Sequence, residues 1–512
     1  MPRSLEAILL AALFAVAHTQ SPLYFSNQNQ YFVQGLADGG HGHLSADWLA
    51  NTRDPTPVFS ALVAFGYRAF GEWSFQAAYF LMLMGYFLVA RSFVAAVGVP
   101  DTRAARVVFA ALFTAAHAAI LRWASVKLTG VDYPWYFQAG VAGQYMLGAG
   151  LQPSAFGVLL FASLAAFAHD RPVRAGALAA SACVFHSTYL LPAGLLVAAM
   201  ILGQTRRGGL RIGGVALLIV LPVIAHTIWK FAPTDGATFT ESQSVLAEVR
   251  IPHHAVVGRW FDVIAGLQVC WMVLGLALLR REKVAPVYLA LLIAGVGLTV
   301  TQLLLANPTF ALMFPWRISV LLVPVATAVV CAKLAALQGG RSTTVVAGLL
   351  LALLVFGGIL VTTQRLGYHS NDAENELYSW VRANAKPGDV FLLPVRIPAV
   401  GTGRGSVSTS FTPPPRPKPD SNLIPVDLQR FRLHAAAPIY VDFKAVPYAD
   451  TEVLEWLRRM NKCQAWYDGA WNRDELKAEG VTHVVAPRDR PVTTEYLEEV
   501  RRDGAYVVYR VK

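Results

Sequence analysis

Long apolar runs alternate with short polar segments over the first two thirds of the chain. Three of the clearest runs are GGVALLIVLPVIAHTIW, VYLALLIAGVGLTVTQLLL and TTVVAGLLLALLVFGGILV. A helix needs ~20 apolar residues to cross the hydrocarbon core of a bilayer, and runs of this kind meet that length. The pattern predicts a polytopic α-helical membrane protein.

Composition agrees with this pattern and removes other classes of protein. Hydrophobic residues make up 55% of the 512 and charged residues only 15%, which excludes a soluble fold. The net charge of +11 does not indicate nucleic-acid binding, because Lys and Arg lie in short clusters between apolar runs, where they orient the spans. The four cysteines show no CxxC spacing, so neither a disulfide framework nor a zinc knuckle is expected.

The basic clusters define a topology. Cytoplasmic loops collect Lys and Arg, which places the N-terminus inside and residues 25–72 outside. The first segment, MPRSLEAILLAALFAVAHTQ, is either a signal peptide or an uncleaved first span, and the spans that follow favour the second. Residues 175–203 connect two clusters on the same side and therefore predict a short helical hairpin. Counting in this way gives about eleven spans, with TPVFSALVAFGYRAF as a helix on the outer face.

The character of the chain changes after residue 364. Residues 365–512 alternate helical and strand patterns, which predicts a small periplasmic α/β domain behind a transmembrane core of residues 1–364. We expect strands in APIYVDFKAVP and at the ends of the later segments, and a helix then a strand in TTEYLEEVRRDGAYVVYRVK. Residues 396–426 are rich in Pro, Gly and Ser and form an insertion.

Two acidic residues lie in the first external loop. Asp47 and Asp54 are seven positions apart, and the prolines after Asp54 prevent one regular helix from containing both. A carboxylate at the water boundary could deprotonate an acceptor hydroxyl, and His43 and Trp48 of the same loop are candidate substrate contacts. The alternative for Asp54 is a helix cap, since Asp before Pro is a strong cap signal.

A second polar cluster lies in VRIPHHAVVGRWFD, residues 250–262. Its basic members are candidate phosphate ligands, because Arg holds a phosphate through two parallel hydrogen bonds. These candidates are Arg250, His253, His254 and Arg259. The alternative is an ordinary positive membrane border with an interfacial Trp.

The remaining candidates are scattered among aromatic segments. Asp132, Tyr145 and His186 could bond or stack on a sugar, although interfacial belts use the same residue types. Arg317 lies in an apolar run near the outer surface, where an unpaired charge is costly, so it either reaches water or meets an anion.

Taken together, these segments resemble the GT-C class of integral-membrane glycosyltransferases. The likeness rests on the architecture and on DWLANTRDPTPVFSAL, LQPSAFGVLL, IPHHAVVGRW, FPWRIS and FRLHAAAPIYVDFKAVP, which look like a group of uncharacterised bacterial membrane proteins. The resemblance implies a polyprenyl-phosphate-linked sugar donor, with Asp47 as the favoured base and Asp54 in reserve. It also implies that basic residues hold the carrier phosphate and that Arg432 and Lys444 of the tail face the membrane core. A divalent Mg or Mn ion is a possible cofactor of such a site.

The chain departs from the common GT-C pattern directly after its first span. Many members carry an acidic residue there, whereas this chain has SNQNQ at residues 26–30, and amides form hydrogen bonds but do not act as bases.

The leading expectation is therefore a glycosyltransferase of the bacterial inner membrane. It would transfer a sugar from the lipid-linked donor to a glycan, lipid or protein acceptor at the periplasmic face. One alternative is a transporter or flippase of a lipid-linked or anionic solute, which would need ionisable residues near mid-membrane. The other is a non-catalytic membrane assembly protein, which the SNQNQ departure keeps open.

Overall fold

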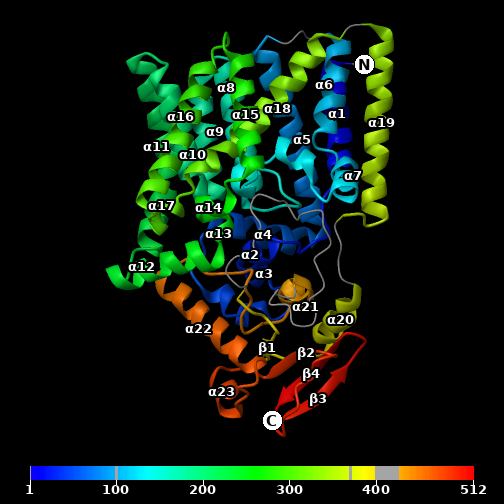
Figure 1. Ribbon diagram of the computed structural model, residues 1–512, viewed down its shortest axis with the longest axis vertical. Coiled ribbons are helices and arrows are strands. Elements are labelled where there is room, and N and C mark those ends of the chain that lie inside the picture. Colours follow the sequence, from blue (N-terminus) through cyan, green and yellow to red (C-terminus); the bar gives the residue numbers. More distant parts are fainter. Residues whose placement is uncertain (1, 99–101, 339, 368–371, 398–425) are drawn as a thin grey trace.

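The computed structural model describes residues 2–98, 102–338, 340–367, 372–397 and 426–512. A bundle of helices leads into a smaller domain that contains a sheet, and the two termini lie at opposite ends of the molecule (Figure 1). The predicted Pro/Gly-rich insertion, residues 396–426, falls almost entirely outside the described residues.

Five helical segments are long and apolar enough to cross a membrane. They are α5 (Trp73–Ala96), α11 (Arg206–Lys230), α16 (Ala285–Leu305), the segment Pro308–Ala336 with α17 (Pro308–Ala311) and α18 (Ser319–Ala336), and α19 (Arg341–Thr363). A bent pair, α6 (Arg103–Ala115) and α7 (Ala119–Thr129), makes a sixth if it is one span. Their outer faces expose apolar side chains such as Leu218 and Leu349, as helices solvated by lipid do. The chain is therefore built as a mostly helical membrane protein, while the count of about eleven spans stays a prediction.

Shorter apolar helices fill the rest of the bundle. They are α1 (Arg3–His18), α4 (Pro57–Phe70), α8 (Val158–Ala168), α9 (Pro172–Phe185), α10 (Leu190–Leu202) and α15 (Val263–Leu279). The predicted hairpin is present as α9 and α10, which pack against each other and against α11. With 14 and 13 residues, neither is long enough to cross a bilayer unaided.

Ion pairs join basic clusters that the sequence places on one side. Glu6 of α1 accepts from Arg106 of α6 at 2.7 Å, and Lys283 pairs with Asp170. These contacts bring the start of the chain to the start of α6, and the α8–α9 turn to the α15–α16 turn. Both agree with the expected topology.

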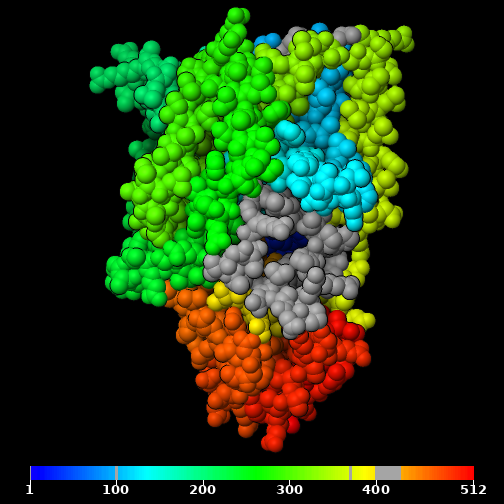
Figure 2. All heavy atoms as spheres, in the orientation of Figure 1, coloured from blue at the N-terminus to red at the C-terminus, as the bar shows by residue number. Residues whose placement is uncertain are grey.

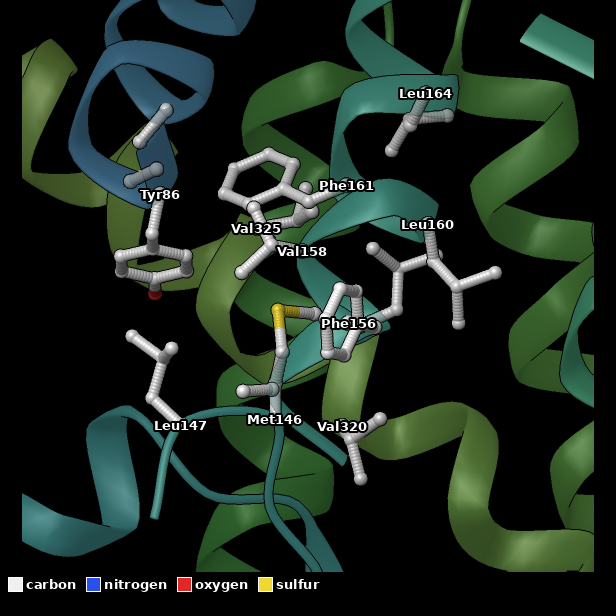
Figure 3. Packing of buried hydrophobic residues seen from close by; sticks show 14 of the residues in the cluster. Tyr86, Met146, Leu147, Phe156, Val158, Leu160, Phe161, Leu164, Val320 and Val325 are labelled. Atoms are coloured by element: carbon white, nitrogen blue, oxygen red, sulfur yellow. The ribbon is translucent and has the colours of Figure 1, made fainter. Parts of the chain in front are cut away.

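The core of the bundle is aromatic and closely packed. Tyr86 of α5 meets Phe161 of α8 with ring centroids 6.0 Å apart, and Phe156 stacks on Phe185 at 3.7 Å. Val325 of α18 lies in the same cluster (Figure 3). Rings and branched side chains from helices distant in sequence therefore fix the bundle as one unit.

Short helices lie between the bundle and the tail (Figure 1). They are α2 (Gln28–Tyr31), α3 (Val33–Gly39), α12 (Gly236–Ser244), α13 (Pro252–Ala255) and α14 (Val257–Trp260). Figure 2 shows the surface of α22 (Asp450–Tyr467), in orange, directly against the green segment that includes α12. Thr234, just before α12, donates its hydroxyl to Asp450 of α22 at 2.9 Å.

The tail combines helices with one four-stranded sheet. The helices are α20 (Asn375–Asn384), α21 (Phe431–Ala435), α22 and α23 (Arg473–Ala478), and the strands are β1 (Phe391–Leu392), β2 (His483–Pro487), β3 (Leu497–Arg502) and β4 (Tyr506–Val511). The strand order is β1-β2-β4-β3, with β1 parallel to β2 and the other pairs antiparallel.

Two of the predicted tail elements are wrong. TTEYLEEVRRDGAYVVYRVK does not begin with a helix, because Leu497–Arg502 pairs with β4 as an edge strand and Asp503 closes the turn by accepting from the amides of Ala505 and Tyr506. APIYVDFKAVP is not a strand either. It pairs with β1 only around Ile439. The amide of Ile439 donates to the Asp47 carboxylate of the first external loop and not to a strand.

Candidate functional site

The first external loop is fastened to the tail by backbone contacts. The amide of His43 donates to the carbonyl of Ala436 at 2.9 Å, and the ring of His41 bonds the carbonyl of Leu433 at 2.8 Å. Between them Gly42 has φ +55°, and a Cβ there would lie 2.4 Å from the Ala436 oxygen. Only glycine allows this approach, so the loop and the tail meet backbone to backbone.

Asp47 lies at the centre of this contact and is completely buried. One carboxylate oxygen accepts from the amide of Leu49 at 2.9 Å, and the other from Arg432 Nε at 2.9 Å and the amide of Ile439 at 3.0 Å. Arg432 also donates to Asp442 at 2.7 Å. Burial alone would lower the pKa of Arg432, but the two carboxylates outweigh it and raise the pKa. Its oxygens therefore already hold three donors, one of them the ion-pair partner Arg432, an arrangement that does not favour Asp47 as a base, and its role as the favoured base stays a prediction.

The SNQNQ segment takes part in the same fastening. Gln30 donates from its amide nitrogen to the Val446 carbonyl at 2.9 Å and accepts from the Val446 amide at 2.7 Å. Asp442 accepts from the amide of Ala445 at 2.6 Å. Gln30 thus holds the tail segment 442–448 against the bundle at Val446, while Asp442 bonds within the segment and to Arg432 of the tail.

Beside this segment lies a cavity of about 350 Å³. Its wall combines α2, the start of α4, the turn between α9 and α10, the region before and within α13, the turn before α18 and tail residues 444–448. Its charged and histidine lining residues are His186, Arg250, His253, His254, Arg317 and Lys444. Among the residues that the structure describes, no Asp or Glu lines it, so the cavity carries an uncompensated positive charge.

Local backbone geometry aims these groups inward. A π-helical turn, Val245–Arg250, ends at Arg250, and such turns are frequent at functional sites. Pro252 then starts α13, which carries the two histidines. Arg317 lies in a short 3-10 turn that follows Phe314, whose φ is +49°. The two arginines are therefore positioned by irregular turns, and the two histidines by one short helical turn.

The two arginines have neutral partners only. Arg250 is 8% exposed, donates to the backbone carbonyl of Lys444 and has its Nε buried without a partner. Arg317 donates to Gln144 at 2.5 Å and to Thr188, and its guanidinium lies 4.8 Å from the Phe314 ring centroid. No ion pair with a carboxylate is found for either within the described ranges. Charges buried in this way are stabilised by an anion.

Burial also controls the titration of the cavity. It lowers the pKa of His254 to about 3 and the pKa of His253 well below its usual value, so both imidazoles are neutral at physiological pH. Burial, assisted by Arg250, lowers the pKa of Lys444 to about 7, although Asp442 opposes the change. The cavity therefore contains two fixed cations and one amine that can gain or lose a proton.

Asp54 lies beside the cavity. Its neighbours Pro55 and Thr56 are part of the wall, and its carboxylate accepts from the Thr56 amide at 2.8 Å just before α4. The carbonyl of Asp54 accepts from His226 at 3.2 Å. Burial raises the pKa of the Asp54 carboxyl. The capping alternative is not met, because α4 begins at Pro57 with Thr56 as its N-cap and has no side-chain cap, so Asp54 bonds the chain just ahead of the helix. The raised pKa suits a proton acceptor.

The other sequence candidates lie away from the cavity. Asp132 is buried in an ion pair with Arg122 at 2.7 Å, which corrects its expected role as a hydroxyl ligand. Tyr145 does not line the cavity, and its hydroxyl accepts from the lining residue Asn27 at 2.9 Å. Arg259 is exposed on α14.

Two loop candidates belong to the contact between loop and tail instead. The ring of His43 bonds the Ala385 carbonyl at 3.1 Å, and Trp48 lies under Arg459, whose guanidinium is 4.5 Å from the ring. Neither residue lines the cavity.

Tyr31 and Tyr448 complete the wall and were not predicted. Tyr448 follows the tail motif FKAVP directly, and its place near Lys444 was the available signal. Tyr31 comes one position after SNQNQ, in a segment without acidic residues, so no charged neighbour identified it as a site residue.

A divalent cation does not fit the described residues. No group of three or more His, Cys, Asp or Glu side chains converges there in metal-binding geometry. Asp47 forms an ion pair with Arg432, and within the described ranges no Asp or Glu side chain lines the cavity. The possible Mg or Mn ion therefore has no ligand set among them.

Comparisons with known proteins give one short match and one distant likeness. Residues 416–463, which include Arg432 and Lys444, match a family described as a domain of unknown function (DUF6798). A search of curated proteins finds no match. A structural comparison aligns 99% of this chain with 96% of ArnT from Cupriavidus metallidurans, in its crystal structure bound to undecaprenyl phosphate, at 12% identity and a TM-score of 0.36.

Proposed function

We propose that the chain is an integral-membrane glycosyltransferase whose cationic cavity holds the phosphate of a polyprenyl-phosphate-linked sugar donor. The observation that supports this is the convergence of Arg250, Arg317 and Lys444 in one cavity without a lining carboxylate among the described residues. Breaking the bond between the sugar and the phosphate leaves a further negative charge on the phosphate. Preorganised cations in a site that excludes water stabilise such a charge as it develops.

A second cavity gives a lipid chain a place next to this one. It has about 510 Å³ and is lined by apolar groups of α14, α15, α16 and the turn before α18, including Trp260 and Trp316. Trp316 directly precedes Arg317, so the apolar cavity and the cationic cavity share one turn. A ligand with a charged head and an apolar tail fits this pairing better than a free anion does.

Asp54 is the proposed base. In its ionised form it would accept the proton of an acceptor hydroxyl while the new bond to the sugar forms. Because its pKa is raised, transfer should fall as the pH falls through that pKa, since the protonated carboxyl accepts nothing. Replacing Asp54 with Asn should lower transfer by ~10²–10⁴-fold and leave donor binding intact.

In the same proposal, the reaction takes place at the periplasmic face of the bacterial inner membrane. The N-terminus and the basic clusters would be cytoplasmic, and the tail domain would close the cavity from outside. The acceptor is a glycan, lipid or protein at that face.

The same cavity also favours a second function, a non-catalytic membrane assembly protein that binds a lipid phosphate. Asp47 is held in an ion pair, and no acidic side chain lines the cavity within the described residues. In that case the Asp54→Asn variant would be indistinguishable from wild type in every assay.

Binding tests the proposal most directly. We expect purified chain in detergent to bind geranyl phosphate, and Arg317→Gln to weaken this binding by ~10–100-fold through loss of charge-assisted hydrogen bonds. Arg259→Gln is the matched control, since Arg259 is exposed and outside the cavity. Equal affinities of the two variants would contradict the assignment of the cavity. Transfer of labelled sugar from a polyprenyl-phosphate donor, compared between wild type and Asp54→Asn, then decides between enzyme and assembly protein.

A further inference from the structure

Lys444 is held in the cavity by its backbone and not by its amine. Its carbonyl accepts from Arg250, while Asp442 and Gln30 accept from the amides of the two residues that follow it, Ala445 and Val446. No hydrogen bond or ion pair of its Nζ is found among the described residues, and the side chain lines the cavity. The amine is therefore available to a ligand.

The surroundings of this amine disfavour its charge. Arg250 and Arg317 share its cavity, and both remain charged at any ordinary pH. The nearby carboxylate, Asp442, already accepts from Arg432 at 2.7 Å and from the Ala445 amide at 2.6 Å. A third cation beside two others in a water-poor space is costly, unless an anion enters with it.

We propose that Lys444 takes up a proton as an anion enters the cavity, so that anion binding and protonation of this amine are coupled. This inference rests on the proposed phosphate site but concerns its regulation by pH. An empty cavity then carries two fixed charges, and an occupied cavity carries three. The Lys444 ammonium is thus present in the occupied cavity, where it stabilises the phosphate. It is absent from the empty cavity, where it would only repel Arg250 and Arg317.

The coupling has a defined sign and range. The pKa of Lys444 is about 7 in the empty cavity and must rise when an anion binds. Below pH 7 the amine is protonated in both states, and affinity is independent of this group. Above pH 7 each binding event takes up as much as one proton, so the Kd should rise by as much as ~tenfold per pH unit.

Other groups near Lys444 titrate elsewhere. His253 and His254 have lowered pKa values and would respond only on the acid side, whereas the pKa of Tyr31 is raised well above 10. Burial raises the pKa of the Asp442 carboxyl, and Arg432 opposes that rise, so the Lys444→Arg variant described below separates its response from that of Lys444. The interval from pH 7 to pH 9 therefore reports Lys444.

The experiment measures anion affinity by calorimetry on the full chain in detergent between pH 6 and pH 9. The probes are geranyl sulfate and inorganic sulfate, whose charges do not change in this range. Repeating each titration in buffers of different ionisation enthalpy gives the number of protons taken up. We expect geranyl sulfate to bind with proton uptake that grows from pH 7 upward.

Tighter binding of geranyl sulfate than of inorganic sulfate would indicate a lipid head group as the source of the anion. The reverse order would indicate a free anion, with the same proton uptake. Binding without proton uptake between pH 7 and pH 9 overturns the role of Lys444 but leaves the anion site intact. Failure of both probes to bind at any pH overturns the proposed function and this inference together.

Variants sharpen the result. Lys444→Arg carries a permanent charge, so it should bind as tightly as wild type at pH 6, about tenfold more tightly or better at pH 9, and without proton uptake. Lys386→Arg, an exposed lysine of the same domain, should behave like wild type. A pH dependence that persists in Lys444→Arg would assign the proton to another group and overturn the proposal.

Discussion

Two buried clusters of charge lie close together in this molecule and differ in one respect. At the contact between loop and tail, Arg432 is matched by Asp47 and Asp442. In the cavity, Arg250 and Arg317 have no acidic partner among the described residues. In the first cluster the charged groups form ion pairs with one another, whereas the cations of the second have no anionic partner among the described residues. The comparison teaches that the presence of ion-pair partners, more than burial or residue type, separates a structural contact from a binding site.

The same comparison explains why Asp47 is a poor base and Lys444 a variable cation. The Asp47 carboxylate already holds three donors, one of them its ion-pair partner Arg432, whereas burial and the neighbouring Arg250 lower the pKa of the Lys444 amine to about 7. Breaking each cluster should therefore have a different consequence.

The largest effect is expected at the balanced cluster. Arg432→Met leaves Asp47 and Asp442 buried without their cation and should lower the free energy of unfolding by ~3–5 kcal/mol. Chemical denaturation followed by the fluorescence of tail tryptophans such as Trp456 measures the loss. Arg502→Met, which removes an exposed pair with Glu499, is the control and should leave the free energy of unfolding nearly unchanged. Equal losses would mean that Arg432 does not fasten the tail.

An opposite result is expected in the cavity. Arg250→Met removes a buried charge that has no acidic partner among the described residues, so the free energy of unfolding should change by less than ~1 kcal/mol or increase. Affinity for geranyl phosphate should nevertheless fall by ~10–100-fold. A destabilisation as large as that of Arg432→Met would remove the distinction between the two clusters.

A smaller effect is expected at Gln30, which bonds the tail segment that runs from one cluster to the other. Gln30→Ala removes both hydrogen bonds to Val446 and should lower the free energy of unfolding by ~1–3 kcal/mol, with a modest loss of anion affinity because Lys444 is less firmly placed. Gln34→Ala is the matched control, since Gln34 is a buried amide that bonds only Leu49 within the loop. If Gln30→Ala leaves affinity unchanged, the tail segment does not position Lys444.

Periodicity and charge were enough to predict the helical membrane architecture and part of the cavity. The apolar runs became the long helices, and the length of residues 175–203 predicted the α9–α10 hairpin. His186 was predicted as a hydroxyl ligand, the basic residues of VRIPHHAVVGRW as phosphate ligands, and Arg317 as a charge in an apolar run, and all of these except Arg259 line the cavity.

The rest depended on contacts that leave no local pattern. Asp47 and Arg432 are 385 positions apart, and nothing near either one identifies the other. Six residues, Leu497–Arg502, suit either a helix or an edge strand, and the choice was made by pairing with β4. Asp132 was assigned to sugar because its partner, Arg122, lies on a different element ten residues earlier.

The wall of the cavity has a consequence for how the protein is made. Asn27 and Tyr31 are synthesised early, whereas Lys444 and Tyr448 of the same wall are synthesised long after them. Until then the bundle already inserted in the membrane exposes two arginines in an open cleft. Under the proposed function, the cavity would be complete only after residues 444–448 have folded back onto residues 27–31, and a chain truncated before residue 444 would be unable to close around an anion.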